Sequence, residues 1–199
     1  SANRTAEFFT DSKAPKIKNL LPKKNEFTTG EFSFTFEEEN PHSLILEYGN
    51  SQTGMQEHEM NINSDCVQNG KLHNCIASLD LGDYENQRIN YEVVLVDLAG
   101  QVAQASASNV KVDATFPVVN SIAHVMNGNK ATITLDVTEE NLDKIYYIDS
   151  NGKTKTFCSF TILNKCSKMF TLAPGNNNLE FQVVDKAGNS VSETHAIVL

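Results

Sequence analysis

A strand–turn–strand pattern that occurs twice constrains the fold of this sequence more than any other feature. The second copy is Leu179–Asn189, LEFQVVDKAGN, in which an alternating strand runs into a tight turn, and the strand Val191–Val198 follows it. The first copy is Tyr91–Gly100, YEVVLVDLAG, followed by Val102–Val112, about ninety residues earlier. Alternation of apolar and polar residues on both sides of a turn indicates a β-hairpin. A hairpin repeated at this distance predicts two copies of one β domain.

The remainder of the chain repeats in step with the hairpins. Gly30–Glu37 alternates three phenylalanines with polar residues, and Lys130–Val137 is its counterpart. The polar stretch Gly49–Glu57 is expected to be a connection rather than a strand. We expect about seven strands in each copy and no amphipathic helix, which predicts an all-β chain of two tandem immunoglobulin-like β-sandwiches. The domains are placed at 13–112 and 113–199, with 1–12 as a tail or the remnant of a preceding domain.

Each domain is expected to begin with a short, stiff segment. Asp11 is followed four residues later by Pro15, and Asp113 by Pro117, and a short apolar strand comes next in both places. Proline fixes its own φ and pushes the preceding residue towards extended geometry, which stiffens the segment.

The four cysteines fall two to each half, as Cys66, Cys75, Cys158 and Cys166. Four cysteines allow three pairings, and only Cys66–Cys75 with Cys158–Cys166 lets each copy fold alone. These local pairs, each expected on a hairpin, lack the C-x2-4-C spacing of zinc ligands. Unpaired buried thiols are the alternative, because cysteine is also a common core residue. Disulfides favour an oxidising compartment, so the expected location is extracellular or at the cell surface.

The aspartates and glycines of the two hairpin turns are interpreted as structural residues. The carboxylate of an aspartate can accept backbone N–H bonds from its own turn, while a glycine adopts the positive φ that the turn needs. This interpretation covers Asp97, Gly100, Asp185, Gly188 and Asn189.

These features together resemble the immunoglobulin-like and fibronectin-III-like domains of prokaryotic (bacterial or archaeal) cell-surface proteins. The resemblance is carried by the Asp-x-x-x-Pro segments and by the closing motif V-V-D-x-A-G-N, in which the first copy has Gln101 where the second has Asn189. The chain has no tryptophan and no long cysteine pair, so the antibody-type pattern is not met. The resemblance implies tandem modules of adhesins, S-layer-associated proteins or secreted enzymes. Such sandwiches have many unrelated roles.

Calcium is the one metal or cofactor that the sequence suggests. Oxygen-bearing side chains collect near the expected domain junction, and hard cations take six to eight oxygen ligands. The candidate ligands are Asp113, Glu139, Glu140 and Asp185, with Asn141 beside them. No EF-hand spacing is present, and acidic loops are expected on an acidic protein in any case.

No pattern in the sequence predicts catalysis. There is no G-x-S-x-G motif, no glycine-rich phosphate loop and no H-x-x-x-H pair. The five histidines are dispersed and are expected to be solvated or hydrogen-bonded. Tyr84 or Tyr147 could be an exposed ring on which a sugar stacks. We therefore expect no catalytic residues.

The charge limits the partners. A formal net charge of -9 and a pI near 5.0 disfavour nucleic acid and anionic membranes, and no apolar run approaches the ~18 residues of a membrane span. The expected partners are neighbouring domains of the same chain, and a glycan or a surface protein is a further candidate. The predicted function is a non-enzymatic structural or adhesive module, such as a spacer or stalk. The alternative is a carbohydrate- or protein-recognition module attached to a secreted enzyme.

Overall fold

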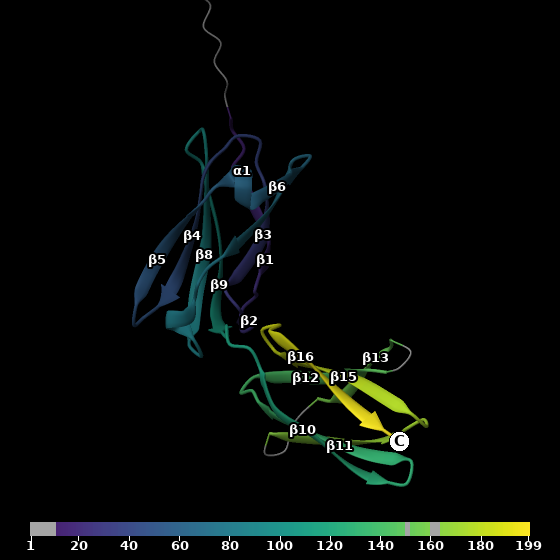
Figure 1. The fold of residues 1–199 in the computed structure, drawn as a ribbon. Helices are drawn as coiled ribbons and strands as arrows, with labels where there is room; N and C mark the ends of the chain where they lie inside the picture. Colours follow the sequence, from purple (N-terminus) through teal and green to yellow (C-terminus); the bar gives the residue numbers. More distant parts are fainter. Residues whose placement is uncertain (1–10, 150–151, 160–163) are drawn as a thin grey trace, which may run out of the picture. The chain divides into compact units, whose positions relative to one another are not determined.

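The computed structural model describes residues 11–149, 152–159 and 164–199. The chain forms two compact units, unit 1 (Ser1–Val112) and unit 2 (Asp113–Leu199). Each unit is built from two β-sheets, and the strands dominate the ribbon in Figure 1. The tail or domain remnant expected at 1–12 lies almost wholly outside the described residues.

Unit 1 has one four-stranded and one five-stranded sheet. The first has the order β1-β3-β7-β6 and the second β2-β9-β8-β4-β5, with every pair antiparallel except β2 and β9. A four-residue helix, α1, and a 3₁₀ turn, η1, interrupt the strands. The elements are β1 (Lys16–Leu21), β2 (Phe27–Thr28), β3 (Glu31–Glu37), β4 (Pro41–Asn50), β5 (Gly54–Met60), α1 (Ile62–Asp65), β6 (Cys66–Asn69), β7 (Leu72–Ser78), η1 (Gly82–Tyr84), β8 (Arg88–Asp97) and β9 (Val102–Val112).

Unit 2 has a three-stranded sheet, β10-β11-β14, and a four-stranded sheet, β13-β12-β15-β16. All of its strand pairs are antiparallel. The strands are β10 (Val118–Asn127), β11 (Lys130–Thr138), β12 (Leu142–Ile148), β13 (Thr154–Cys158), β14 (Lys165–Thr171), β15 (Asn176–Asp185) and β16 (Ser190–Val198).

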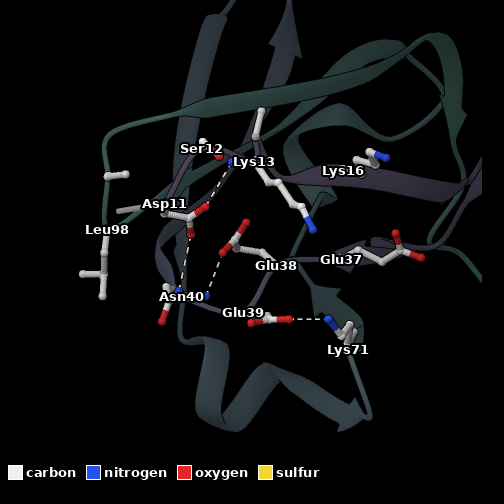
Figure 2. A pocket seen from close by; sticks show the side chains of 12 residues that line it. Asp11, Ser12, Lys13, Lys16, Glu37, Glu38, Glu39, Asn40, Lys71 and Leu98 are labelled. Atoms are coloured by element: carbon white, nitrogen blue, oxygen red, sulfur yellow. Dashed lines mark hydrogen bonds and ion pairs between the residues drawn. The ribbon is translucent and has the colours of Figure 1, made fainter. Parts of the chain in front are cut away.

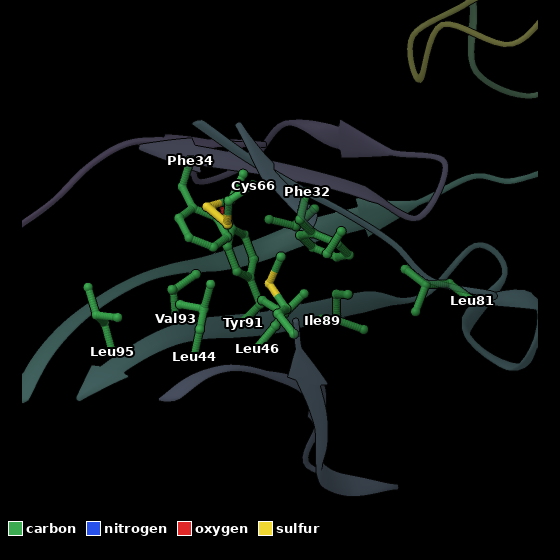
Figure 3. Packing of buried hydrophobic residues seen from close by; sticks show 14 of the residues in the cluster. Phe32, Phe34, Leu44, Leu46, Cys66, Leu81, Ile89, Tyr91, Val93 and Leu95 are labelled. Carbon is green, nitrogen blue, oxygen red and sulfur yellow. A yellow bond between two sulfur atoms is a disulfide. The ribbon is translucent and has the colours of Figure 1, made fainter. Parts of the chain in front are cut away.

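Period-two alternation produces the core of each unit, because successive side chains of a strand point to opposite faces of its sheet. In unit 1, Phe32, Phe34 and Phe36 of β3 are buried, and Phe32 meets the ring of Tyr91 on the other sheet edge to face. Figure 3 shows the rings of Phe32, Phe34 and Tyr91 beside aliphatic side chains of β4 and β8. In unit 2, Ile133 and Leu135 of β11 belong to the corresponding cluster.

The strand order agrees with the expected immunoglobulin-like β-sandwich. If the seven main strands are lettered in chain order, with β2 and β5 taken as additions, β1-β3-β7-β6 is the A-B-E-D sheet of that fold. The prediction of an all-β chain is confirmed, while the number of strands among the described residues differs between the units.

The interpretation of Gly49–Glu57 as a connection was wrong. β5 begins at Gly54 and pairs only with β4 at the sheet edge, where most of its side chains are exposed and leave no apolar alternation in the sequence.

Both predicted disulfides are present, and they join different parts of the two units. Cys66 and Cys75 lie directly opposite each other on β6 and β7, within one sheet. Cys158 ends β13 and Cys166 lies on β14, so this bond joins the two sheets of unit 2. The second pair is therefore not on a hairpin, contrary to the expectation from the sequence. No free cysteine remains.

His73 of β7 departs from the expected solvated histidine. Its side chain is buried in unit 1 and stacks on Phe36, with 4.4 Å between ring centroids. Its Nδ1 atom has no hydrogen-bond partner among the described residues. Burial lowers the pKa of His73, and the nearby Glu38 only partly offsets this effect. The neutral imidazole is therefore the form that the fold accepts.

We expect loss of either disulfide to destabilise its unit. A loop of this size contributes about 2.5 kcal/mol in the chain-entropy model, so Cys66→Ser/Cys75→Ser and Cys158→Ser/Cys166→Ser should each lower the free energy of unfolding by about that amount in urea titrations. Alkylation of the unreduced protein followed by mass spectrometry should detect no free thiol. Stoichiometric labelling of Cys66 or Cys158 would contradict the pairing.

We expect His73→Leu to reduce the loss of stability in acid. The pKa of His73 is lower in the folded state than the ~6.5 of an unfolded chain, so its contribution is complete above that pH and is lost as the pH falls towards the folded-state pKa. The fall in unfolding free energy between pH 7.5 and 5.0 should be smaller for His73→Leu than for the wild type. The exposed His42 is the matched control, and equal effects of His42→Leu and His73→Leu would contradict this account.

Candidate functional site

The hairpin turn at the end of β15 is organised by the carboxylate of Asp185. Its Oδ1 accepts hydrogen bonds from the backbone N–H groups of Ala187 and Asn189, both at 2.9 Å. Gly188 closes the turn with a φ of 97°, a conformation that glycine adopts without steric cost. The Asp185 side chain is 2% exposed, so these bonds replace the water that it has lost.

Side-chain amides connect this turn to the segment that enters unit 2. Asn189 Nδ2 donates to the Asp185 carboxylate at 2.8 Å and to the backbone carbonyl of Asp113 at 2.9 Å. Asn141, in the loop between β11 and β12, donates through Nδ2 to the Asp113 carboxylate at 2.7 Å. We call the arrangement of Asp113, Asn141, Asp185 and Asn189 the amide clamp of unit 2. It holds Asp113, which is 1% exposed, against two loops of its own unit.

Unit 1 contains the same clamp, built from Asp11, Asn40, Asp97 and Gln101. Gln101 Nε2 donates to the Asp97 carboxylate at 3.1 Å and to the backbone carbonyl of Asp11 at 3.3 Å. Asn40 Nδ2 lies 3.4 Å from the Asp11 carboxylate. Gly100, at a φ of 81°, takes the place of Gly188. The Gln101 side chain is one methylene longer than Asn189, yet it reaches the corresponding acceptors.

Each clamp brings three carboxylates together. Ligand atoms of Asp113, Glu139 and Asp185 lie within 4.8 Å of one another in unit 2, as do those of Asp11, Glu38 and Asp97 in unit 1. Burial raises the pKa of Glu139 and of Asp185, and the negative charges around them add to the effect. The unit 2 group therefore favours a proton or a cation that offsets its charge.

Only some of the calcium candidates from the sequence lie close together in the structure. Asp113, Glu139 and Asp185 are brought together, whereas Glu140 is exposed and is not part of the group. Glu139 and Glu140 follow the end of β11, where consecutive side chains point in different directions, so only one of them reaches the clamp.

The carboxylate group of unit 1 was missed. The repeat could have shown it, because Asp11, Glu38 and Asp97 occupy the places of Asp113, Glu139 and Asp185. Apart from the carboxylates themselves, no contact among the described residues points to a cation. Calcium therefore stays a prediction.

An open pocket of about 1090 Å³ adjoins the clamp of unit 1. Figure 2 shows that charged side chains of both signs line it, with Glu39 and Lys71 joined in an ion pair and Asp11 bonded to Lys13 and Asn40. Because charged side chains of both signs are mixed around it, this pocket has no strong electrostatic field of a single sign.

The tyrosines proposed as sugar-stacking rings are not available for that role. Tyr84 is 3% exposed and Tyr147 is 9% exposed. The Tyr84 hydroxyl accepts a hydrogen bond from Thr53 Oγ1 at 3.1 Å, and Tyr147 packs edge to face on Phe170. The prediction of exposed rings was wrong because both side chains point into the cores of their units.

Several solved structures are similar to this chain, whereas no protein-family model and no curated protein matches it. A tetra-tandem repeat from the extending region of a large adhesion protein is similar at 17% identity and a TM-score of 0.37, over 95% of this chain and 50% of that one. The fibronectin(III)-like modules of Clostridium thermocellum CbhA are similar at 11% identity and a TM-score of 0.45, over 93% of both chains. A two-domain fibronectin type-III segment of chicken tenascin gives 16% identity and a TM-score of 0.34, over 92% of this chain and 99% of that one.

The chain spans half the length of the adhesion-protein structure. At these identities and TM-scores the similarities carry no conclusion about function. No helix among the described residues is both long and apolar enough to cross a membrane.

We expect Glu139→Gln to remove an unfavourable charge. The pKa of Glu139 is raised in the folded state, so its contribution to stability is complete below the unfolded-state pKa and is lost as the pH rises through the folded-state pKa. Glutamine carries no charge and can still accept the 2.6 Å bond from the Asn141 N–H. The Tm difference between variant and wild type should be most positive near pH 8 and should shrink towards pH 4.5.

Glu140→Gln is the matched control, because it removes the same charge at the neighbouring exposed position. If the Tm changes of both variants follow the same pH dependence, the effect comes from net charge and not from the clamp.

The same Tm measurements test the calcium prediction. A saturable rise in Tm with CaCl2, reversed by EDTA and weakened by Glu139→Gln alone, would support it, and an unchanged Tm would contradict it.

Proposed function

We propose that this chain is a non-enzymatic structural or adhesive module, a spacer or stalk, of a secreted or cell-surface protein. Each unit would be one domain of a tandem array, and its partners would be the neighbouring domains. The role would be mechanical, because a spacer or stalk has to limit the rotation of one domain against the next.

One observation carries the proposal: where the units join, the backbone of Val112 is hydrogen-bonded to unit 1 and the carbonyl of the next residue, Asp113, is hydrogen-bonded to unit 2. Val112 ends β9, where its N–H donates to Gln87 at 2.9 Å and its carbonyl accepts from Asn86 at 3.1 Å, both within unit 1. The next residue, Asp113, has its carbonyl bonded to Asn189 of unit 2. Because the Val112 peptide groups and the Asp113 carbonyl are each held by a unit, few backbone rotations are left between these two points, which supports a stiff link.

The clamp of unit 1 supports an array longer than these two domains. It fixes Asp11 to Gln101 and Asn40 in the manner in which the clamp of unit 2 fixes Asp113. A spacer built from repeated domains needs such a device wherever the chain enters a domain. The two clamps differ in one of their four residues, Gln101 against Asn189, and the hydrogen-bond pattern is common to both.

The proposed compartment rests on the cysteines. All four are in disulfides, which persist in oxidising surroundings. The acidic composition favours solubility over association with nucleic acid or anionic membranes. The alternative, a carbohydrate-recognition module, has less support, since the two tyrosines that could have served as sugar platforms are buried.

We expect Asn189→Ala to loosen the link between the units. The substitution removes the donor to the Asp113 carbonyl and leaves a buried acceptor unpaired, at a cost of about 1–3 kcal/mol. In the wild type, ¹⁵N relaxation should give one rotational correlation time for both units. In Asn189→Ala the two units should show shorter and separate correlation times.

Gln101→Ala is the matched control, because it removes the corresponding amide from the clamp of unit 1 and leaves the connection at Asp113 intact. It should leave the single correlation time unchanged. Two independent correlation times in the wild type would overturn the stalk proposal, since a freely jointed pair cannot transmit orientation.

A further inference from the structure

Two histidines far apart in the sequence meet at one edge of unit 2. His124 lies on β10 and His195 on β16, and the His124 Nδ1 and His195 Nε2 atoms are 2.9 Å apart. β10 is the edge strand of the three-stranded sheet, and β16 is the edge strand of the four-stranded sheet. The pair therefore bridges the two sheets where no backbone ladder joins them.

The rings are accessible from solvent. His124 is exposed and His195 is half-buried, and their planes meet at 67° with 5.1 Å between centroids. Burial, together with His124, lowers the pKa of His195, which favours the neutral ring. Neutral imidazole is the form that binds metals.

We propose that His124 and His195 form a binding site for a divalent transition-metal ion of the Cu²⁺ or Ni²⁺ type. With metal–nitrogen bonds of about 2.0–2.1 Å, two nitrogens 2.9 Å apart subtend an angle of about 90° at the metal. Right angles between ligands occur in the square-planar and tetragonal sites that Cu²⁺ and Ni²⁺ prefer. Water from the exposed side would complete the coordination.

Binding needs only a local change in the pair. In the hydrogen-bonded pair, one of the two facing nitrogens carries a proton. When the metal binds, that ring changes to its other tautomer. The proton leaves the facing nitrogen, and the other ring nitrogen takes one up from water. A rotation of each ring then turns its lone pair from the facing nitrogen to the metal, and no charge is gained or lost by the rings.

The site would act as a staple between the two sheets of unit 2. The Cys158–Cys166 disulfide already joins these sheets through β13 and β14, and the histidines would join them through the edge strands β10 and β16. A ligand that binds only the folded state stabilises it in proportion to its occupancy. Metal binding should therefore raise the melting temperature of unit 2.

This site is distinct from the carboxylate groups of the clamps. Imidazole suits Cu²⁺, Ni²⁺ and Zn²⁺, whereas Ca²⁺ and Mg²⁺ take oxygen ligands. Calcium should neither occupy the histidine pair nor compete for it. The stalk proposal does not depend on this metal site, and failure of either leaves the other standing.

The test is a titration of the full chain with Cu²⁺, followed by pulsed EPR, which counts the imidazoles bound to copper. The wild type should show one site with two imidazole nitrogens and a higher melting temperature. His124→Ala and His195→Ala should each lose the two-imidazole signal and weaken Cu²⁺ binding in calorimetry by tenfold or more. Calcium at the same concentration should leave the copper EPR signal of this site unchanged, both in the wild type and in the two variants.

His42→Ala and His58→Ala are matched controls, because they remove histidines of unit 1 and should retain the two-imidazole signal. Both His124 and His195 are solvent-accessible, so their alanine variants should fold, which a far-UV circular dichroism spectrum checks. A signal that survives in the double variant His124→Ala/His195→Ala, or a wild-type spectrum with a single imidazole, would overturn the proposal.

Discussion

The buried carboxylates of Asp97 and Asp185 impose the constraint on which the rest of each unit depends. A carboxylate removed from water must be matched by hydrogen-bond donors, or its burial costs several kcal/mol. Here the donors are the N–H groups of the turn itself and one side-chain amide that also reaches the segment entering the unit. The need to solvate one carboxylate thus fixes the hairpin, the loop beside it and the path of the incoming chain.

The two units meet this constraint with different residues. Asn189 places its amide between Asp185 and the Asp113 carbonyl, and Gln101 does the same between Asp97 and Asp11 with a longer side chain. The shorter side chain makes the shorter bonds, at 2.8 and 2.9 Å against 3.1 and 3.3 Å. A longer side chain also loses more rotamer freedom when it is fixed. On both counts the clamp of unit 2 should be the stronger of the two.

Strands with alternating apolar and polar residues could be predicted from the sequence, whereas a strand without this alternation was missed. The strand Val102–Val112 was placed with both of its ends correct, and the local disulfides followed from the division of four cysteines between two copies. β5 was missed because an exposed edge strand has no buried face to impose alternation.

The candidate sites show the same limit. Three of the four calcium candidates do converge, because loops at one end of a sandwich lie close together. Their counterparts in unit 1 were readable from the repeat and were overlooked. The His124–His195 pair had no local signal at all, since its two residues are brought together only by the packing of two sheets.

The central claim is that side-chain amides hold the incoming segment to its unit, and hydrogen exchange tests it most directly. NMR can follow the side-chain amide hydrogens of Asn141 and Asn189 with the backbone N–H groups of the Asp185 turn. The account predicts that these hydrogens exchange far more slowly than those of exposed amides, and that the backbone N–H of Asn189 is protected like the N–H groups of β15. Exchange at the rate of an unstructured loop, with β15 still protected, would contradict the clamp.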